Sequence, residues 1–298
     1  MFFTKSAHMN ALLKTGQIFY GTGIIAYGIQ QLVILDFRPQ ILPAFPFWAH
    51  QHSVFAIVTG LAMVLLGGVI TGMLKTKSLA PGNVCLYVGL YFFVLILTCQ
   101  IPYLLFIYPH KLSHLGSWGD LLKELAFCGG AFVLAGSYKK EISSGREGHS
   151  FNLLIAKLAP VGRLFFCTTM FLFGCCHFAY SQFISLMVPK WLGMPEFWTY
   201  FGGVALIGAG FTIALKLFLK PVALLLATML FLWFFLVHVP GAIANPAAGN
   251  GNAIVSAFDA LLFCGVALVL SQTNKHPENK VAKASWPSNT VEKSRIRV

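Results

Sequence analysis

The sequence contains few charged residues. Asp, Glu, Lys and Arg make up 10% of the 298 residues, and hydrophobic residues make up 57%. Soluble domains usually carry about 25% charged residues, so this composition does not fit a soluble surface. Most of the chain is therefore expected to lie in a lipid bilayer.

Several patterns that carry chemistry are also missing. The sequence has no Cys-x-x-Cys or Glu-x-x-His pair, no Ser-His-Asp arrangement and no glycine-rich phosphate loop. The seven cysteines all fall inside apolar runs, where we expect small buried side chains rather than thiol–disulfide chemistry. We predict no metal site, no stand-alone enzyme and no binding of nucleic acid, because a nucleic-acid interface needs a basic patch on a soluble face.

What the sequence does contain is a series of long apolar runs. Runs of about 20 residues are long enough to cross the hydrocarbon layer as helices, and lipid forces the backbone groups of each run to pair within it. None of the runs alternates as a barrel strand would. We predict eight transmembrane helices at 15–36, 50–75, 83–108, 119–138, 162–188, 198–219, 220–242 and 252–271.

Lysine and arginine predict the orientation of these helices. If the N-terminus is cytoplasmic, 17 of the 21 Lys and Arg residues fall on the inner side. The outer side keeps Arg38, Lys111, Lys123 and Lys190. This asymmetry follows the positive-inside rule and accounts for the net charge of +12. Both termini are expected to be cytoplasmic, and the first apolar run is expected to be retained because no signal-peptide pattern precedes it.

The two halves of the chain resemble one another. Residues recur at offsets that drift from 146 to 136, as small loop insertions would produce. The matched sets are Gly16, Phe19, Gly28 and Pro43 with Gly162, Phe165, Gly174 and Pro189; Gly60, Ala62 and Gly67 with Gly203, Ala205 and Gly210; Gln100 and Pro102 with His238 and Pro240; and Phe127-Cys128-Gly129 with Phe263-Cys264-Gly265. Four spans in each half start both halves on the same side, which predicts parallel repeats.

The predicted organisation is therefore all-α, a polytopic membrane protein of two parallel four-helix repeats. The first repeat covers 1–138 and the second 162–271. A cytoplasmic linker at 139–161 joins them, and a basic tail at 272–298 has a composition typical of disorder. Part of the linker could form a short amphipathic piece on the membrane surface.

Motifs in the second half carry a resemblance to a known family. They are Gly174-Cys175-Cys176-His177-Phe178, Val188-Pro189-Lys190-Trp191-Leu192, Phe197 through Leu206, and Val237-His238-Val239-Pro240. This half resembles the DoxX-like membrane proteins, which are four-helix units found singly or in tandem. The first half is a degenerate version, with Gln31 and Gln100 in place of the two histidines. The acidic residue that many relatives carry early in the second helix is absent at Gly202 and Gly203.

The resemblance implies a location and a context. Family members lie in the bacterial cytoplasmic (inner) membrane. Some are linked to thiosulfate:quinone oxidoreduction and others accompany redox-stress enzymes. The resemblance thus implies an accessory subunit with a redox partner protein, and it is also compatible with a homo-oligomer.

The candidate ligand-binding residues lie in the outer half of the second repeat. They are His177, His238, Asp259 and Trp233. An ionisable residue inside a membrane is costly unless it is paired or used, and we expect Asp259 to pair with His238 or His177. Glu124 is expected near the surface, solvated or paired locally. The two histidines could also serve only as hydrogen-bonding groups within the bundle.

Three functions remain open at this point. The leading one is an accessory redox-associated subunit whose polar pocket holds a quinone, the one cofactor considered, or another lipid headgroup. The alternatives are a small-solute transporter and a non-catalytic membrane anchor for a partner protein. Ligand binding that depends on the histidines would favour the first of these.

Overall fold

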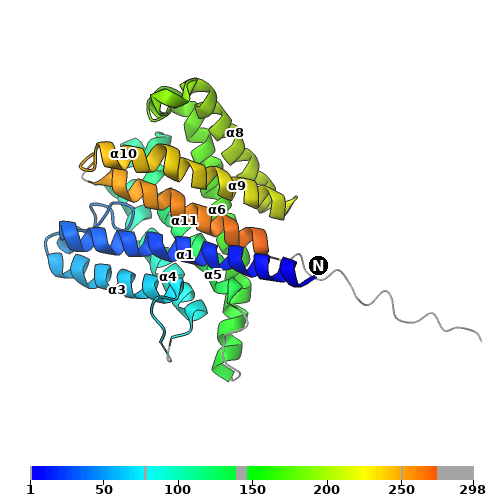
Figure 1. Ribbon diagram of the computed structural model, residues 1–298. Coiled ribbons are helices and arrows are strands. Elements are labelled where there is room, and N and C mark those ends of the chain that lie inside the picture. Colours follow the sequence, from blue (N-terminus) through cyan, green and yellow to red (C-terminus); the bar gives the residue numbers. More distant parts are fainter. Residues whose placement is uncertain (1, 77–78, 139–145, 250, 274–298) are drawn as a thin grey trace, which may run out of the picture.

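The chain folds into a bundle of helices. The structure, a computed structural model, describes residues 2–76, 79–138, 146–249 and 251–273 (Figure 1). Every regular element in these ranges is a helix. The long helices are α1 (Phe2–Ile34), α3 (Ser53–Thr71), α4 (Pro81–Leu95), α5 (Gly119–Ser137), α6 (Arg146–Ala179), α8 (Pro195–Ala214), α9 (Leu219–Trp233) and α11 (Asn252–Gln272).

Short helical elements connect or extend the long ones. They are α2 (Phe47–His50), α7 (Ser181–Ser185), α10 (Val239–Ala244), the 3₁₀ turns η3 (Pro109–Lys111), η4 (Leu115–Trp118) and η5 (Lys190–Leu192), and the π-helical turns η1 (Ile96–Gln100), η2 (Tyr103–Ile107) and η6 (Phe234–His238).

Six helices are long and apolar enough to cross a membrane. They cover Ser53–Thr71, Pro81–Ile107, Ser150–Ala179, Pro195–Ala214, Leu219–Ala244 and Asn252–Gln272. The membrane class is thereby confirmed. The other two predicted spans correspond to α1 and α5, which are helices but do not belong to this set. In α5 the reason is visible in the sequence, because Asp120, Lys123 and Glu124 fall within its first two turns.

The segment between the two halves differs from the prediction in part. Residues 146–161 of the predicted linker belong to α6, which begins at Arg146 and continues past the internal Pro160 to Ala179. The first part of the linker, 139–145, and the predicted tail from 274 onward lie outside the described residues.

Two helices lie at the centre of the bundle. Almost every residue from Leu121 to Ala135 of α5 and from Ala257 to Ser271 of α11 is buried. α5 packs against α4, α6 and α11, and α11 packs against α1, α5 and α9. Helices α3 and α8 cover α1 and α6 respectively. The two halves of the chain therefore meet along α1–α11, α5–α6 and α5–α11.

Glycines bring the helices of the two halves close together. A Cβ atom on Gly129 of α5 would lie 2.5 Å from the carbonyl oxygen of Gly162 in α6. A Cβ atom on Gly16 of α1 would lie 2.7 Å from the carbonyl oxygen of Gly265 in α11. Small residues allow this backbone approach in lipid, where the association of helices depends on packing. The two contacts use matched positions of the two halves.

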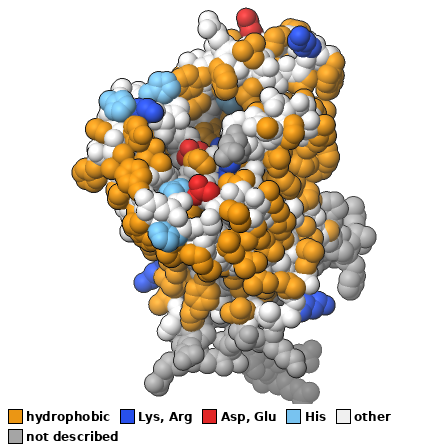
Figure 2. Space-filling view, turned by 90° about the vertical axis from the view of Figure 1, so that its left-hand side faces the viewer, with side chains coloured by type: hydrophobic (Ala, Val, Ile, Leu, Met, Phe, Trp, Pro, Cys, Tyr) orange, Lys and Arg blue, Asp and Glu red, His pale blue; other side chains and the backbone are white. Residues whose placement is uncertain are grey.

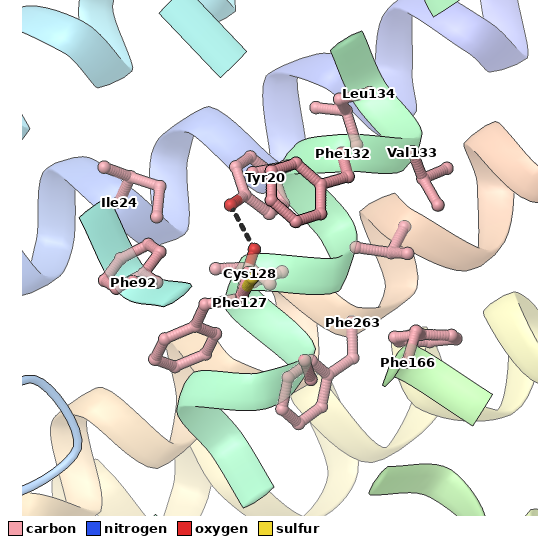
Figure 3. Packing of buried hydrophobic residues seen from close by; sticks show 14 of the residues in the cluster. Tyr20, Ile24, Phe92, Phe127, Cys128, Phe132, Val133, Leu134, Phe166 and Phe263 are labelled. Carbon is pink, nitrogen blue, oxygen red and sulfur yellow. Dashed lines mark hydrogen bonds between the residues drawn. The ribbon is translucent and has the colours of Figure 1, made fainter. Parts of the chain in front are cut away.

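Aromatic side chains fill the space between α5 and α11 (Figure 3). The rings of Phe127 and Phe263 lie 6.0 Å apart between centroids. The Tyr20 hydroxyl of α1 donates a hydrogen bond to the Phe127 carbonyl at 2.7 Å. Phe166 of α6 packs edge-on against Phe263. This core holds both halves together.

Cys128 and Cys264, which hold matched positions in the two halves, make similar contacts. The Cys128 thiol donates to the Gly89 carbonyl of α4 at 3.3 Å. The Cys264 thiol donates to the Ala227 carbonyl of α9 at 3.2 Å. Both thiols are buried and free, and each ties a central helix to the preceding helix of its own half.

A change of helix type precedes two prolines. Helix α4 continues into the π-turn η1, which ends at Gln100, and α9 continues into η6, which ends at His238. Pro102 and Pro240 follow two residues later. Proline has no backbone N–H for the helical ladder, and π-turns allow the chain to accommodate such a break, often at functional sites. The similar motifs around Gln100 and His238 thus adopt the same local structure.

Candidate functional site

Helix α1 ends and α11 begins at the same end of the bundle, on the left-hand side of Figure 1. Polar contacts of residues from α1, α5, α11 and the loop after α1 lie toward this end. Figure 2 looks onto this end and shows a hollow that contains both acidic and basic side chains, with histidines on the surface around it. The positive-inside rule predicts this end to be the outer one.

Asp259 is the centre of this polar cluster. Its side chain is buried although it carries a carboxylate. The Tyr27 hydroxyl donates to Oδ1 at 2.6 Å, and Lys123 Nζ lies 2.8 Å from Oδ2. Both partners belong to the first half of the chain. The predicted pairing of Asp259 with His238 or His177 is therefore wrong, because Tyr27 and Lys123 already engage the two carboxylate oxygens.

The ion pair between Lys123 and Asp259 allows α5 and α11 each to bury a charged side chain. The Lys123 side chain is 18% exposed and that of Asp259 is 5% exposed. Either charge alone would be costly at this depth, because an unpaired ion loses its hydration without replacement. Lys123 was counted as an outer-side lysine on sequence alone, and its burial was not foreseen.

The loop after α1 adds a second set of contacts. Gln40 Nε2 donates to Asp120 Oδ1 at 2.7 Å and to Asn252 Oδ1 at 3.0 Å. Gln30 Nε2 donates to the Gly251 carbonyl at 2.8 Å. These hydrogen bonds tie the loop and the end of α1 to the starts of α5 and α11.

Arg38 completes the cluster from the same loop. Its side chain is buried, and that burial lowers its pKa. The nearby Tyr27, Asp120 and Asp259 oppose this shift. An arginine keeps its proton in proteins, so the cluster contains two cations, Arg38 and Lys123, against the carboxylates of Asp120 and Asp259.

His238 lies beside this cluster rather than inside its hydrogen bonds. It is the last residue of η6, and Asp259 and Lys123 are the charged groups that act on it electrostatically. Among the described residues, none forms a hydrogen bond with its ring. Its side chain is half-buried.

His177 forms a separate arrangement with Trp233. Its Nδ1 pairs with the Phe173 carbonyl at 2.9 Å, and its ring stacks on Trp233 with 5.7 Å between centroids and 20° between planes. Gly202 of α8 makes room for the pair, since a Cβ there would lie 2.6 Å from Trp233 Cη2. Both rings are half-buried.

The four candidate residues thus fall into two places. His177 and Trp233 share one face between α6, α8 and α9, while Asp259 belongs to the charged cluster with His238 beside it. The glutamines at the matching positions of the first half are buried and bonded. Gln31 Nε2 donates to Thr59 Oγ1 at 3.1 Å, and Gln100 Nε2 donates to the Pro39 carbonyl at 2.8 Å.

Sequence reasoning missed several members of the site. Tyr27 and Gln40 gave no signal, and Arg38 was noted only as an outer-side charge, because the contacts of all three depend on how distant segments pack together. Glu124 was expected near the surface but is fully buried, since α5 is the central helix of its half. The three charges in the first two turns of an apolar run were the available signal.

A metal ion would need several ligating side chains close together. No group of three or more His, Cys, Asp or Glu side chains that could hold a metal ion occurs within the described ranges. His110 and His114 are four residues apart but do not share a helix, because η3 ends at Lys111. The interfacial His50 instead pairs with Asp36 at 2.8 Å.

Comparisons of the chain with protein-family models, with curated proteins and with solved structures found no match.

Proposed function

We propose that this integral membrane protein is a DoxX-like tandem of two parallel four-helix units that binds a quinone, or a similar planar lipid headgroup, in the outer half of the bilayer. In this proposal it serves as an accessory subunit of a redox partner in a bacterial inner membrane. The six long apolar helices establish contact with the bilayer; the remaining statements are inferred from the following contacts.

Matched contacts support the tandem arrangement. Phe127 and Phe263 occupy corresponding positions and pack against each other, as do Lys123 and Asp259. A contact between corresponding positions is what a two-fold axis produces in a symmetric dimer. Such an axis between α5 and α11 fits parallel repeats.

The same arrangement accounts for α1 and α5 as spans. Two of the three charged residues of α5 are compatible with a membrane position, because Lys123 pairs with Asp259 inside the bundle and Asp120 accepts a hydrogen bond from Gln40. Helix α1, with 33 residues, is longer than a bilayer requires. We therefore infer eight spans.

The stacked pair of His177 and Trp233 is the observation that carries the ligand proposal. A half-buried aromatic face beside an imidazole suits a flat ring, which can stack and accept or donate one hydrogen bond. Small-molecule sites are commonly built in this way, with an apolar wall and few polar groups. Trp233 lies in a span that also leads directly to His238.

The tautomer of His177 indicates which form of the ligand fits. A neutral His177 that donates from Nδ1 to the Phe173 carbonyl presents the lone pair of Nε2. That atom accepts a hydrogen bond from the hydroxyl of a reduced quinol. We therefore expect the site to prefer a quinol to the oxidised quinone.

The test is to purify the protein in mild detergent and measure the quinone and quinol that co-purify, by extraction, absorbance and mass spectrometry. His177→Ala and Trp233→Leu should each remove most of the bound ligand. His52→Ala, which changes an exposed histidine, is the matched control and should retain it. Equal ligand content in all four proteins would refute the proposal and leave a membrane anchor as the better reading.

The charged hollow favours a second candidate, a carrier for a small polar solute. Buried ionisable residues inside a bundle often mark the path of a substrate or an ion, and Asp259 interacts with both Lys123 and Arg38. Counterflow of candidate solutes in proteoliposomes would distinguish this activity from quinone binding.

A further inference from the structure

Glu124 is the most deeply buried carboxyl group among the described residues. Its side chain is 0% exposed, and neither of its carboxyl oxygens accepts a hydrogen bond from the part of the chain that the structure describes. It lies about one helical turn after Asp120 on the central helix α5. The quinone proposal does not use this residue.

The positive charge next to Glu124 in the sequence, Lys123, is already paired with Asp259, and no other cation among the described residues acts on Glu124. The ionisable groups that it influences are Tyr91 of α4, Cys99 of η1 and Cys128 of α5. Asp120 is the charged residue that acts on it, and that residue is an acid like itself. No charged group of α6 or α11, within the described ranges, acts on it.

Gln100 is a polar neighbour of Glu124 but does not neutralise it. The Gln100 side chain interacts with the Glu124 carboxyl, while its Nε2 donates a hydrogen bond to the Pro39 carbonyl at 2.8 Å. An amide can share a hydrogen bond with an acid, but it carries no charge to balance a carboxylate.

The cost of burying a charge determines whether the Glu124 carboxyl is protonated. An isolated carboxylate in an apolar interior loses far more hydration energy than one neutral hydrogen bond can restore, and such a group takes up a proton instead. Asp259 differs in this respect, because a cation, Lys123, and a hydroxyl donor, Tyr27, contact its carboxylate. Glu124 has neither a cation nor a hydroxyl donor as a partner among the described residues.

We propose that Glu124 is a proton-binding site, which holds a proton at neutral pH and exchanges it with water in the hollow by way of Asp120. Asp120 is half-buried and precedes Glu124 by four residues, so both carboxyl groups lie on one face of α5. Gln40 holds Asp120 in place through a hydrogen bond of 2.7 Å. A proton entering from the hollow reaches Asp120 first.

Infrared spectroscopy of the purified protein tests this proposal. A protonated carboxylic acid in an apolar site gives a C=O stretching band that is separate from the amide bands and shifts in heavy water. The wild-type protein should show this band at neutral pH, and Glu124→Gln should lose it. Asp36→Asn, which removes an exposed acid paired with His50, is the control and should leave the band unchanged.

Two further measurements, isotope labelling and the addition of sodium chloride, complete the test. If Glu124→Gln does not fold, wild-type protein with ¹³C-labelled glutamate side chains identifies the band by its isotope shift. The band should also persist when sodium chloride is added at constant pH. Absence of a glutamic acid band at neutral pH, or its loss on addition of sodium, would overturn the proposal, the second result because it would assign the site to a metal cation.

Discussion

The Tyr27 hydroxyl and the Asp259 carboxylate form a hydrogen bond of 2.6 Å between the first and the last of the long helices. The two residues are 232 positions apart in the sequence. Their contact closes the polar end of the bundle, and it makes the stability of the second half depend on a side chain of the first.

Replacing Tyr27 with Phe should therefore destabilise the protein. The substitution keeps the ring, which packs edge-on against Phe127, and removes only the hydroxyl. A hydrogen bond to a charged acceptor contributes about 1.5–3 kcal/mol, and we expect a loss of that size. The free energy of unfolding in mixed detergent micelles measures it. Tyr87→Phe, at a more exposed ring, should change stability by less than about 0.5 kcal/mol.

The ion pair between Lys123 and Asp259 should show strong coupling. Lys123→Met leaves a buried carboxylate without its cation, and Asp259→Leu leaves a buried ammonium without its anion. Each single change should cost about 3–5 kcal/mol, whereas the double change should cost much less than the sum, since a buried pair replaced by apolar groups is often tolerated. A double-mutant cycle on unfolding free energies measures the coupling. Additive losses would contradict the interaction.

The glycine contacts between the halves should not tolerate a side chain. Gly129→Ala would place a Cβ atom 2.5 Å from the Gly162 carbonyl oxygen, so the helices α5 and α6 must move apart. We expect a loss of about 1–3 kcal/mol, as for overpacked cores. Gly208→Ala is the matched control, because a Cβ at that helical position meets nothing within 4 Å. It should be neutral or slightly stabilising. Thermal unfolding in detergent compares the two.

Cysteine labelling in intact cells should establish the orientation. Thr76→Cys, in the loop after α3, and Ser113→Cys, in the loop before α5, both change exposed residues. If the N-terminus is cytoplasmic, a charged maleimide that cannot cross the membrane should label Cys at position 113 and not at position 76. Wild-type protein reports the background from its own thiols. The reverse pattern would invert the inferred topology.

Much of the fold was predictable because lipid restricts the choice of structure. Six of the predicted apolar runs overlap helices that can cross a membrane, although their bounds shifted. The largest shift concerns α6, where the apolar stretch preceding Pro160 continues the helix instead of lying apart from it. Hydropathy indicates that a segment is buried but does not separate a helix in lipid from its extension beyond the membrane.

The site was predicted less well, because its partners come from distant segments. The residue types His177, Trp233, His238 and Asp259 could be selected from their cost in lipid, and two of them do stack together. Which group neutralises Asp259 depends on how α5 and α11 face one another, and no local pattern records that. A charged residue on a central helix, such as Glu124, cannot be distinguished by sequence from one near a helix end.

The ion pair at the centre of the cluster also bears on why the two halves share one chain. Lys123 lies five residues before Cys128, and Asp259 lies five residues before Cys264. Two identical copies of either half, assembled in the same way as a homodimer, would set lysine against lysine or aspartate against aspartate. Such like-charged pairs repel in a medium of low polarity. In the proposed tandem arrangement, joining two diverged halves lets one copy supply the cation and the other the anion, so the chain can place opposite charges where a self-assembled pair would have to leave that position uncharged.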